Sequence, residues 1–450
     1  MRLLNKNVVV FALLLASFET RAQHVLSATI SGLKHQTVYL SGYTGLQLQR
    51  MDSTIADEQG GFVFDKIVEK GMYVLASRDF RLEWLYDGSP VQFVLPDLDE
   101  LNTIHFVNSP LNEHWLAYLM KREFYRHQKE VLKQVIRQYD PSTDFYRQAK
   151  LEFNAMQEDF GRFTDSLIAL DDDYASLLIR NDRESPIDLE MKGSEQRAWL
   201  IDHFLDEVDF NDTDLIRTNV LTTKMVDYLS LFQGLDGVDS DVAFALGMDR
   251  LLAKAKVNMR MYEFVLEYML EGFSALGLTA VTDYLLNYPQ LGEGEITVEE
   301  GLRLDSIVEP YQKVRVGVAA PDYEGVTIDG KPYHLYDSKA KRIIVFFWST
   351  DCEYCHDFLT SIRKKIDLNS DFELVTFALA ENQEEVMEAV KKMKLPGYHF
   401  FDEKRWEGKA FLDYHVFSTP TALVLDADKT IVYKPYDWQD LRTWMKKKTK

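Results

Sequence analysis

The sequence predicts a multidomain protein with an N-terminal antiparallel β-domain, a central α-helical domain and a C-terminal α/β domain. First, its 450 residues exceed what one hydrophobic core usually organises. Second, apolar residues alternate through the first hundred positions and then recur with a helical period. Third, strand-like and helix-like segments alternate towards the C-terminus. We place the three domains at residues 24–108, 110–312 and 315–450.

The composition is that of a globular protein whose acidic charge is unevenly distributed. Hydrophobic residues make up 46% of the chain and aromatic residues 13%, which argues against a disordered protein. The formal net charge of -21 argues against nucleic acid or an anionic membrane surface as a partner, because both would repel it. Residues 315–450 contain 21 Lys and Arg against 22 Asp and Glu. Nearly all the excess acid therefore precedes residue 315, which supports a domain boundary there.

The first 22 residues have the pattern of a cleaved secretory signal peptide. Arg2 and Lys6 give a basic start, Val8 to Phe18 is apolar, and Ala22 is a small residue at the expected cleavage point. The apolar run is short for a bilayer span, and no later stretch has 18 consecutive apolar residues. We therefore expect a periplasmic or secreted protein with no integral membrane span in its mature form. A retained N-terminal anchor is the alternative.

The predicted β and helical domains differ in the period of their apolar residues. Residues 24–108 contain short alternating runs separated by Gly, Asp and Pro, which is typical of an antiparallel sheet or sandwich. In residues 110–312 the period is near 3.6, and about six to eight helices fit this length. One predicted helical face is formed by Val257, Met261, Phe264, Val265, Tyr268 and Met269. Core packing is the simplest role for that face.

The C-terminal part predicts an ordered series of strands and helices around the two cysteines. After a hairpin at 326–336, the expected elements are a strand at 343–348, a helix at 355–366, a strand at 372–378, a helix at 381–393, a hairpin at 421–433 and a helix at 438–448. Cys352 and Cys355, the only cysteines of the chain, lie between the first of these strands and the first helix.

A Cys-x-x-Cys pair at a helix start is suited to redox chemistry. Cys352 would lie beside unpaired backbone N–H groups and the positive end of the helix dipole, which favours its thiolate. Cys355 would lie one helical turn along, close enough to resolve a mixed disulfide. Disulfides persist outside the cytosol, so the expected export is compatible with this chemistry.

Five groups of residues in the range 315–450 follow a known pattern: Gly317 to Asp322, Asp329-Gly330, Val345 to Trp348, the cysteine pair, and Thr419-Pro420-Thr421. In these residues the segment resembles the TlpA/ResA type of thioredoxin-like domain in the redoxin and AhpC-TSA superfamily. The resemblance implies a cis Thr419-Pro420 bond beside the cysteines, with Thr419, Pro420 and Trp348 binding substrate. It also implies a thiol-disulfide oxidoreductase in which Cys352 is the nucleophile and Cys355 the resolving thiol.

The resemblance also implies a class of partner, and the N-terminal domain has a resemblance of its own. The partners it implies are protein thiols or disulfides and a redox donor that the sequence does not identify, with no cofactor and no metal. Residues Asp52 to Phe64 read as strand, turn and strand. They resemble a small β-domain of unknown function that precedes thioredoxin-like domains in exported Bacteroidetes proteins, and no catalytic residue comes with it.

The chain departs from the family pattern at the positions that handle protons. Phe346 stands where thioredoxin has a buried acid, and Phe358 where ResA-type helices have a Glu. We therefore consider Asp357, or water, for proton handling at the second cysteine. The acidic flank, formed by Asp351, Glu353 and Asp357, disfavours a thiolate nearby. This favours a reductase or isomerase over a strong oxidant.

Three other functions remain open from the sequence. Peroxiredoxin chemistry needs an upstream Pro, where this chain has Val345, although Ser349 is present. Copper or zinc binding would use the cysteines with histidines, for which the candidates are His334, His356, His399 and His415. A non-enzymatic scaffold is the third possibility, because more than 300 residues precede the cysteine-containing domain.

Overall fold

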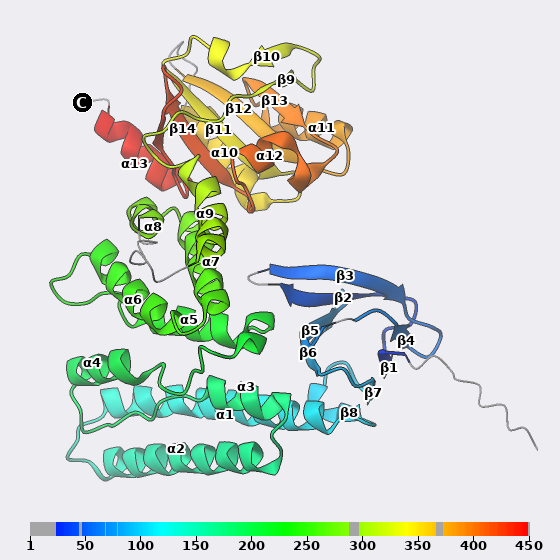
Figure 1. The fold of residues 1–450 in the computed structure, drawn as a ribbon, viewed down its shortest axis with the longest axis vertical. Coiled ribbons are helices and arrows are strands. Elements are labelled where there is room, and N and C mark those ends of the chain that lie inside the picture. The colour runs from blue at the N-terminus through cyan, green and yellow to red at the C-terminus, as the bar shows by residue number, and fades with distance from the viewer. Residues whose placement is uncertain are drawn as a thin grey trace, which may run out of the picture. The chain divides into compact units, whose positions relative to one another are not determined.

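The computed structural model describes residues 24–44, 47–67, 69–78, 80–287, 297–365 and 372–448 (Figure 1). The predicted signal peptide, residues 1–22, lies outside the described residues. The chain divides into two compact units, Met1–Arg183 and Glu184–Lys450. The division falls inside the range 110–312 that the sequence assigns to one helical domain. Each unit is described by itself.

The first unit contains two four-stranded sheets, with strand orders β4-β1-β7-β8 and β3-β2-β5-β6. Their strands are β1 (Leu26–Ile30), β2 (Thr37–Thr44), β3 (Gln47–Ile55), β4 (Gly61–Phe64), β5 (Gly71–Ala76), β6 (Arg81–Tyr86), β7 (Val91–Leu95) and β8 (His105–Phe106). The described pairings are antiparallel except that β1 runs parallel to β7. Alternation of side chains is the same in both kinds of sheet, so the sequence pattern does not specify strand direction.

Three helices complete the first unit: α1 (Pro110–Gln138), α2 (Asp144–Leu170) and α3 (Tyr174–Asp182). Each begins after a residue whose side chain caps it, namely Ser109, Thr143 and Asp173. The Asp182 side chain is buried and accepts a 2.7 Å hydrogen bond from the hydroxyl of Tyr118 on α1. The buried carboxylate is therefore satisfied rather than free for chemistry.

The helical part of the second unit contains α4 (Gly193–His203), α5 (Val220–Ser230), α6 (Ser240–Ala255), α7 (Met259–Ala275), α8 (Thr279–Leu286) and α9 (Val298–Gln312). Met261, Phe264, Val265 and Met269 of the predicted apolar face are buried in α7. Val257 is exposed instead, because α7 begins only at Met259. None of the described helices combines the length and apolarity that a membrane crossing needs.

A five-stranded sheet forms the centre of the C-terminal part, in the order β13-β12-β11-β14-β15. Its strands are β11 (Arg342–Ser349), β12 (Phe372–Leu379), β13 (Tyr398–Phe401), β14 (Thr421–Asp426) and β15 (Ile431–Tyr433), and the short hairpin of β9 (Glu324–Val326) and β10 (Pro332–His334) precedes them. Strand β11 is parallel to β12 and antiparallel to β14. This arrangement is the thioredoxin-like sheet that the sequence predicts.

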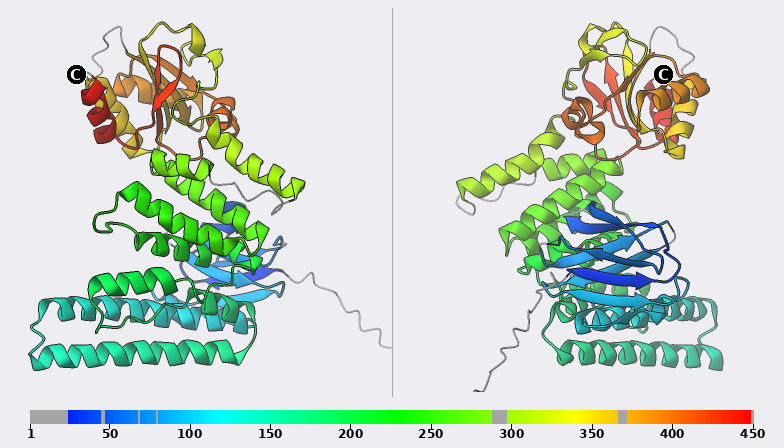
Figure 2. Two further views of the ribbon diagram at one scale, coloured as in Figure 1. Left: turned by 60° about the vertical axis from the view of Figure 1, so that its left-hand side comes forward. Right: turned by 90° about the vertical axis from the view of Figure 1, so that its right-hand side faces the viewer.

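Helices cover both faces of this sheet, so β11 is buried on both sides. Ile344, Phe346 and Trp348 face a core shared with α10 (Glu353–Lys365), α11 (Gln383–Met393) and α13 (Trp438–Lys448). Alternate residues of β11 face a second core that includes α12 (Lys409–Asp413). Helix α13 lies beside α10 (Figure 2). The central strand therefore places residue 349 and the turn after it at one end of the sheet.

Candidate functional site

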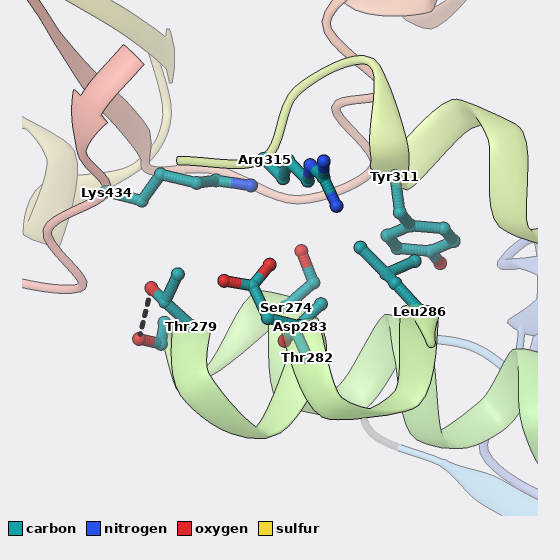
Figure 3. A pocket seen from close by; sticks show the side chains of 9 residues that line it. Ser274, Thr279, Thr282, Asp283, Leu286, Tyr311, Arg315 and Lys434 are labelled. Atoms are coloured by element: carbon teal, nitrogen blue, oxygen red, sulfur yellow. Dashed lines mark hydrogen bonds between the residues drawn. The ribbon is translucent and has the colours of Figure 1, made fainter. Parts of the chain in front are cut away.

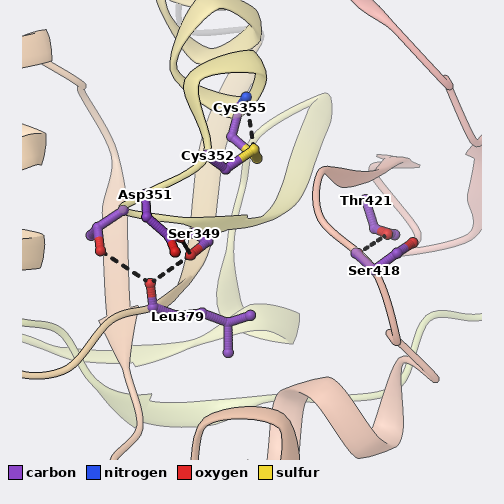
Figure 4. The surroundings of a disulfide bond; sticks show 8 residues. Ser349, Asp351, Cys352, Cys355, Leu379, Ser418 and Thr421 are labelled. Atoms are coloured by element: carbon purple, nitrogen blue, oxygen red, sulfur yellow. Dashed lines mark hydrogen bonds between the residues drawn. A yellow bond between two sulfur atoms is a disulfide. The ribbon is translucent and has the colours of Figure 1, made fainter. Parts of the chain in front are cut away.

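The cysteine pair lies in the turn between β11 and α10. The backbone N–H of Cys352 donates to the carbonyl of Ser349 at 3.2 Å, and α10 begins at the next residue. Cys352 and Cys355 form a disulfide, with their Cα atoms 5.2 Å apart (Figure 4). The redox pair is therefore placed by the end of a buried strand and the first turn of a helix.

The two sulfurs differ in accessibility. The Cys355 side chain is 0% exposed and packs in the core that also contains Phe346 and Trp348. Cys352 is only partly buried. An external thiol or disulfide therefore reaches the sulfur of Cys352 first, which is the arrangement needed for a nucleophilic first cysteine and a resolving second one.

Backbone groups at the start of α10 favour negative charge on the Cys352 sulfur. The N–H of Cys355 donates to that sulfur at 3.1 Å. The remaining first-turn N–H groups and the helix dipole act in the same direction. A hydrogen bond to the charged form stabilises it, so this local geometry supports a thiolate.

The acidic flank acts in the opposite direction. Asp351, Glu353 and Asp357 are all exposed around the start of α10. The carboxylate of Asp351 accepts a hydrogen bond from the hydroxyl of Ser349. Three negative charges next to the first cysteine repel a developing thiolate, although solvent screens them.

Asp357 is poorly placed for proton transfer to Cys355. It follows Cys355 by two residues on α10, which turns its side chain about 200° around the helix axis. Its side chain is exposed, whereas that of Cys355 is buried. The proton-handling role of Asp357 stays a prediction, and this placement gives it no support.

Two phenylalanines occupy the positions at which the related families have acidic residues. Phe346 on β11 and Phe358 on α10 are both buried, with ring centroids 5.0 Å apart in an edge-to-face contact. This geometry is favourable for an aromatic pair. The surroundings of Cys355 on this side are therefore apolar, and burial in such surroundings disfavours its thiolate.

Trp348 is part of the core rather than of the surface. Its side chain is 0% exposed, and its ring lies 5.7 Å from that of His356. The indole Nε1 of Trp348 and the Nε2 of His356 are buried without a hydrogen-bond partner in the described part of the chain. The predicted contact between Trp348 and substrate therefore has no support in this arrangement, because a substrate cannot reach the ring.

The loop before β14 lies at the end of the sheet where β11 leads into the cysteine turn. The Thr419-Pro420 peptide bond is cis, as the sequence predicts. The register pairs Phe347 with Thr421, which brings the preceding residues to the same end of the sheet as the cysteine turn. Thr421 Oγ1 donates to the carbonyl of Ser418 at 2.8 Å and holds the loop's shape (Figure 4). Substrate binding by Thr419 and Pro420 stays a prediction. The two residues lie at the end of the sheet that carries the cysteine turn, as this role requires.

Three of the four candidate metal-binding histidines have separate local partners. His334 bonds to Asp322 at 2.7 Å, and His399 bonds to the Thr376 hydroxyl at 2.8 Å. His415 packs against the ring of Tyr311. Within the described ranges, no group of three or more His, Cys, Asp and Glu side chains is arranged to hold a metal ion.

Two exposed tyrosines at the edge of the site are not predicted from the sequence. Tyr354, inside the Cys-x-x-Cys motif, is 54% exposed, and Tyr436, just after β15, is 55% exposed. Partial burial raises the pKa of Tyr354, and so do the neighbouring Asp437 and Tyr436. Asp437 and Tyr436 therefore lie within electrostatic range of the Tyr354 hydroxyl. The position of Tyr354 between the cysteines is the signal that would have identified it.

Comparison with known proteins assigns families to two segments. Residues 316–434 match the AhpC/TSA family, and residues 184–272 match a family described as a domain of unknown function, DUF5106. The second match covers helices α4 to α6 and most of α7, not the N-terminal sheets. Thioredoxin-like protein YneN of Bacillus subtilis is 27% identical over 128 residues, which are 27% of this chain and 74% of that protein.

Two of the solved structures that the chain is similar to come from Bacteroides. A thioredoxin-like protein of Bacteroides caccae is 17% identical and covers 59% of this chain and 97% of its own, with a TM-score of 0.38. A thiol-disulfide oxidoreductase of Bacteroides fragilis is 18% identical, with 29% and 98% covered and a TM-score of 0.27. These scores are low, so the family match and the sheet itself carry the assignment. Residues 316–434, with the Cys352–Cys355 pair, are an AhpC/TSA-family domain of thioredoxin-like fold.

Proposed function

We propose that this protein is an exported thiol-disulfide oxidoreductase that acts on cysteine-containing proteins. The observation that carries the proposal is the asymmetric pair, in which an accessible Cys352 is joined to a buried Cys355 at the start of α10. The AhpC/TSA-family match and the thioredoxin-like relative support an oxidoreductase. The signal-like N-terminus favours the periplasm or the exterior of the cell.

The reaction uses only the two sulfurs. In the reduced protein, the thiolate of Cys352 attacks one sulfur of a substrate disulfide, and the other substrate sulfur leaves as a thiolate and takes up a proton. The thiolate of Cys355 then attacks the sulfur of Cys352 and releases the second substrate thiol. Two electrons pass to the substrate, and the protein is left with its Cys352–Cys355 disulfide. An external dithiol must reduce it again, so no cofactor is needed.

The charges around the site favour reduction or isomerisation. A strong oxidant of this type depends on a highly stabilised thiolate in its reduced form. Here the acidic flank and the buried Phe346–Phe358 pair both disfavour thiolates, while the helix start favours one. The balance supports a protein that gives electrons more readily than it takes them.

The proposal is tested with the full-length mature chain. We expect it to accelerate insulin reduction by dithiothreitol, and we expect Cys352→Ser to abolish this activity. Cys355→Ser should retain the first step and accumulate a mixed disulfide that mass spectrometry detects on Cys352. A wild-type chain that neither reduces insulin nor exchanges with glutathione disulfide would support a scaffold role instead.

A further inference from the structure

We propose that helices α7, α8 and α9 are part of the substrate-binding site and favour polypeptide substrates over small disulfides. The proposal rests on the thiol-disulfide exchange proposed above and adds the part of the fold that recognises the substrate. Two loops lie at the end of the sheet where β11 leads into the cysteine turn: residues 415–420, which precede β14, and residues 434–437, which follow β15. Three separate contacts connect these loops to the helices.

The first contact is made by Tyr311 near the end of α9. Its buried ring lies 4.3 Å from the ring of His415, at an interplanar angle of 76°, and 6.4 Å from that of Phe417. His415 has a φ of 49°, so the backbone makes a sharp left-handed turn at the point where Tyr311 packs. Tyr311 therefore supports the segment that leads directly into Thr419 and Pro420.

The second contact is a close approach between Gly277 and Tyr436. Gly277 follows α7 with a φ of 67°, and a Cβ placed on it would lie 2.7 Å from the Cβ of Tyr436. Any other residue at this position would force the two backbones apart. The turn between α7 and α8 is thus pressed against the loop that carries the exposed Tyr436.

The third contact is electrostatic. A cavity of about 20 Å³ receives the carboxylate of Asp283 from α8, the amine of Lys434 from the end of β15, and the guanidinium of Arg315 (Figure 3). Burial lowers the pKa of Lys434 to about 8, and Asp283 opposes this change. Burial likewise raises the pKa of Asp283, against the effect of the two cations. The opposite charges attract one another across this cavity, which α8 shares with the loop that begins at Lys434.

These contacts lie at the end of the sheet that carries the cysteine turn, where exposed side chains form an apolar rim. Tyr354 and Tyr436 form the rim with their half-exposed rings, and Leu276, which precedes Gly277, is 62% exposed. A small disulfide needs only the sulfur of Cys352. A polypeptide also covers the surface around its cysteine, so an apolar side chain next to that cysteine gains contact area on the tyrosine rings. The helices therefore contribute to the recognition of apolar residues beside the substrate's cysteine.

The test compares two substrates, insulin and glutathione disulfide, in the full-length mature chain. Tyr436→Ser removes an exposed ring and should leave folding intact. Tyr311→Ala removes the support of the 415–420 loop, and Tyr311→Phe keeps the ring. The matched control is Tyr228→Ala, which removes an equally buried tyrosine that packs within the helices against Phe204 and Phe232.

We expect Tyr436→Ser and Tyr311→Ala to lower kcat/KM for insulin by about 10-fold, mainly through KM, because both misplace or remove substrate contacts. Their kcat/KM for glutathione disulfide should change less than about 2-fold, and Tyr311→Phe and Tyr228→Ala should leave the insulin-to-glutathione ratio unchanged. Equal losses on both substrates, or the same ratio in Tyr311→Ala as in Tyr228→Ala, would overturn the inference. An inactive wild type on both substrates would refute the proposed exchange reaction itself.

Discussion

His415 gives a prediction of stability against pH that can be worked from its surroundings. Burial is the main cause that lowers its pKa from 6.5 to about 4, and the nearby Lys434 adds to this. Its Nε2 is buried without a hydrogen-bond partner in the described part of the chain. In the unfolded chain the ring titrates at its ordinary value. Between pH 6.5 and 4 the unfolded chain therefore binds more protons than the folded one.

The sign and size of the effect follow from this difference in proton binding. The stability associated with the neutral ring is fully present above pH 6.5 and is lost as the pH falls towards 4. The free energy of unfolding should fall by up to about 1.4 kcal/mol per pH unit, or about 3 kcal/mol over the window.

The perturbation is His415→Asn, since Asn tolerates the positive φ at this position. Urea denaturation of wild type and variant at pH 4.5, 5.5, 6.5 and 7.5 measures the difference in their free energies of unfolding. The variant lacks the contact with Tyr311, so it should be less stable at pH 7.5, and the difference should shrink as the pH falls. The other histidines titrate in both proteins and cancel. A difference constant to about 0.5 kcal/mol across the range would refute the reasoning.

Three further changes test the electrostatics and packing of the C-terminal domain. Neutralising the acidic flank to Asn and Gln should lower the pKa of the Cys352 thiol in the reduced protein, as followed by thiolate absorbance. Salt at 1 M should reduce this effect, and an unchanged pKa at low salt would argue against the repulsion. Phe346→Ala should lower the free energy of unfolding by about 3–5 kcal/mol, because it empties a fully buried site against Phe358, and a loss under about 1 kcal/mol in urea denaturation would contradict the packing. Burial lowers the pKa of Lys434 to about 8, so wild type should gain stability relative to Lys434→Met as the pH rises from 8 to 10.5. A difference between the two melting temperatures that does not change over this range would contradict the prediction.

The elements that the sequence predicts well are those with strong local signals. Strand β11 appears as a continuous apolar run because both of its faces are buried. The cysteine pair and the Thr419-Pro420 bond lie where the family pattern places them. Strand β13 and helix α12 are not predicted, because segments of four and five residues are too short to show a clear period.

The features that the sequence does not predict depend on contacts between distant segments. The parallel pairing of β1 with β7 joins residues far apart in the chain. The burial of Trp348 depends on α10 and α13, which cover its face of the sheet. The support that Tyr311 gives to the loop before Pro420 likewise joins an α-helix to the thioredoxin-like fold. A pattern within one segment carries no information on these partners.

The reduction potential of the Cys352–Cys355 pair tests the central proposal most directly. It is measured by equilibrating the full-length mature chain with glutathione or dithiothreitol buffers and quantifying the free thiols. The acidic flank and the apolar surroundings of Cys355 predict a value between about -270 and -180 mV, the range of reducing and isomerising dithiols. A value near -120 mV, typical of a strong oxidant, would contradict the predicted direction. A pair that does not exchange with either buffer would contradict a thiol-disulfide function altogether.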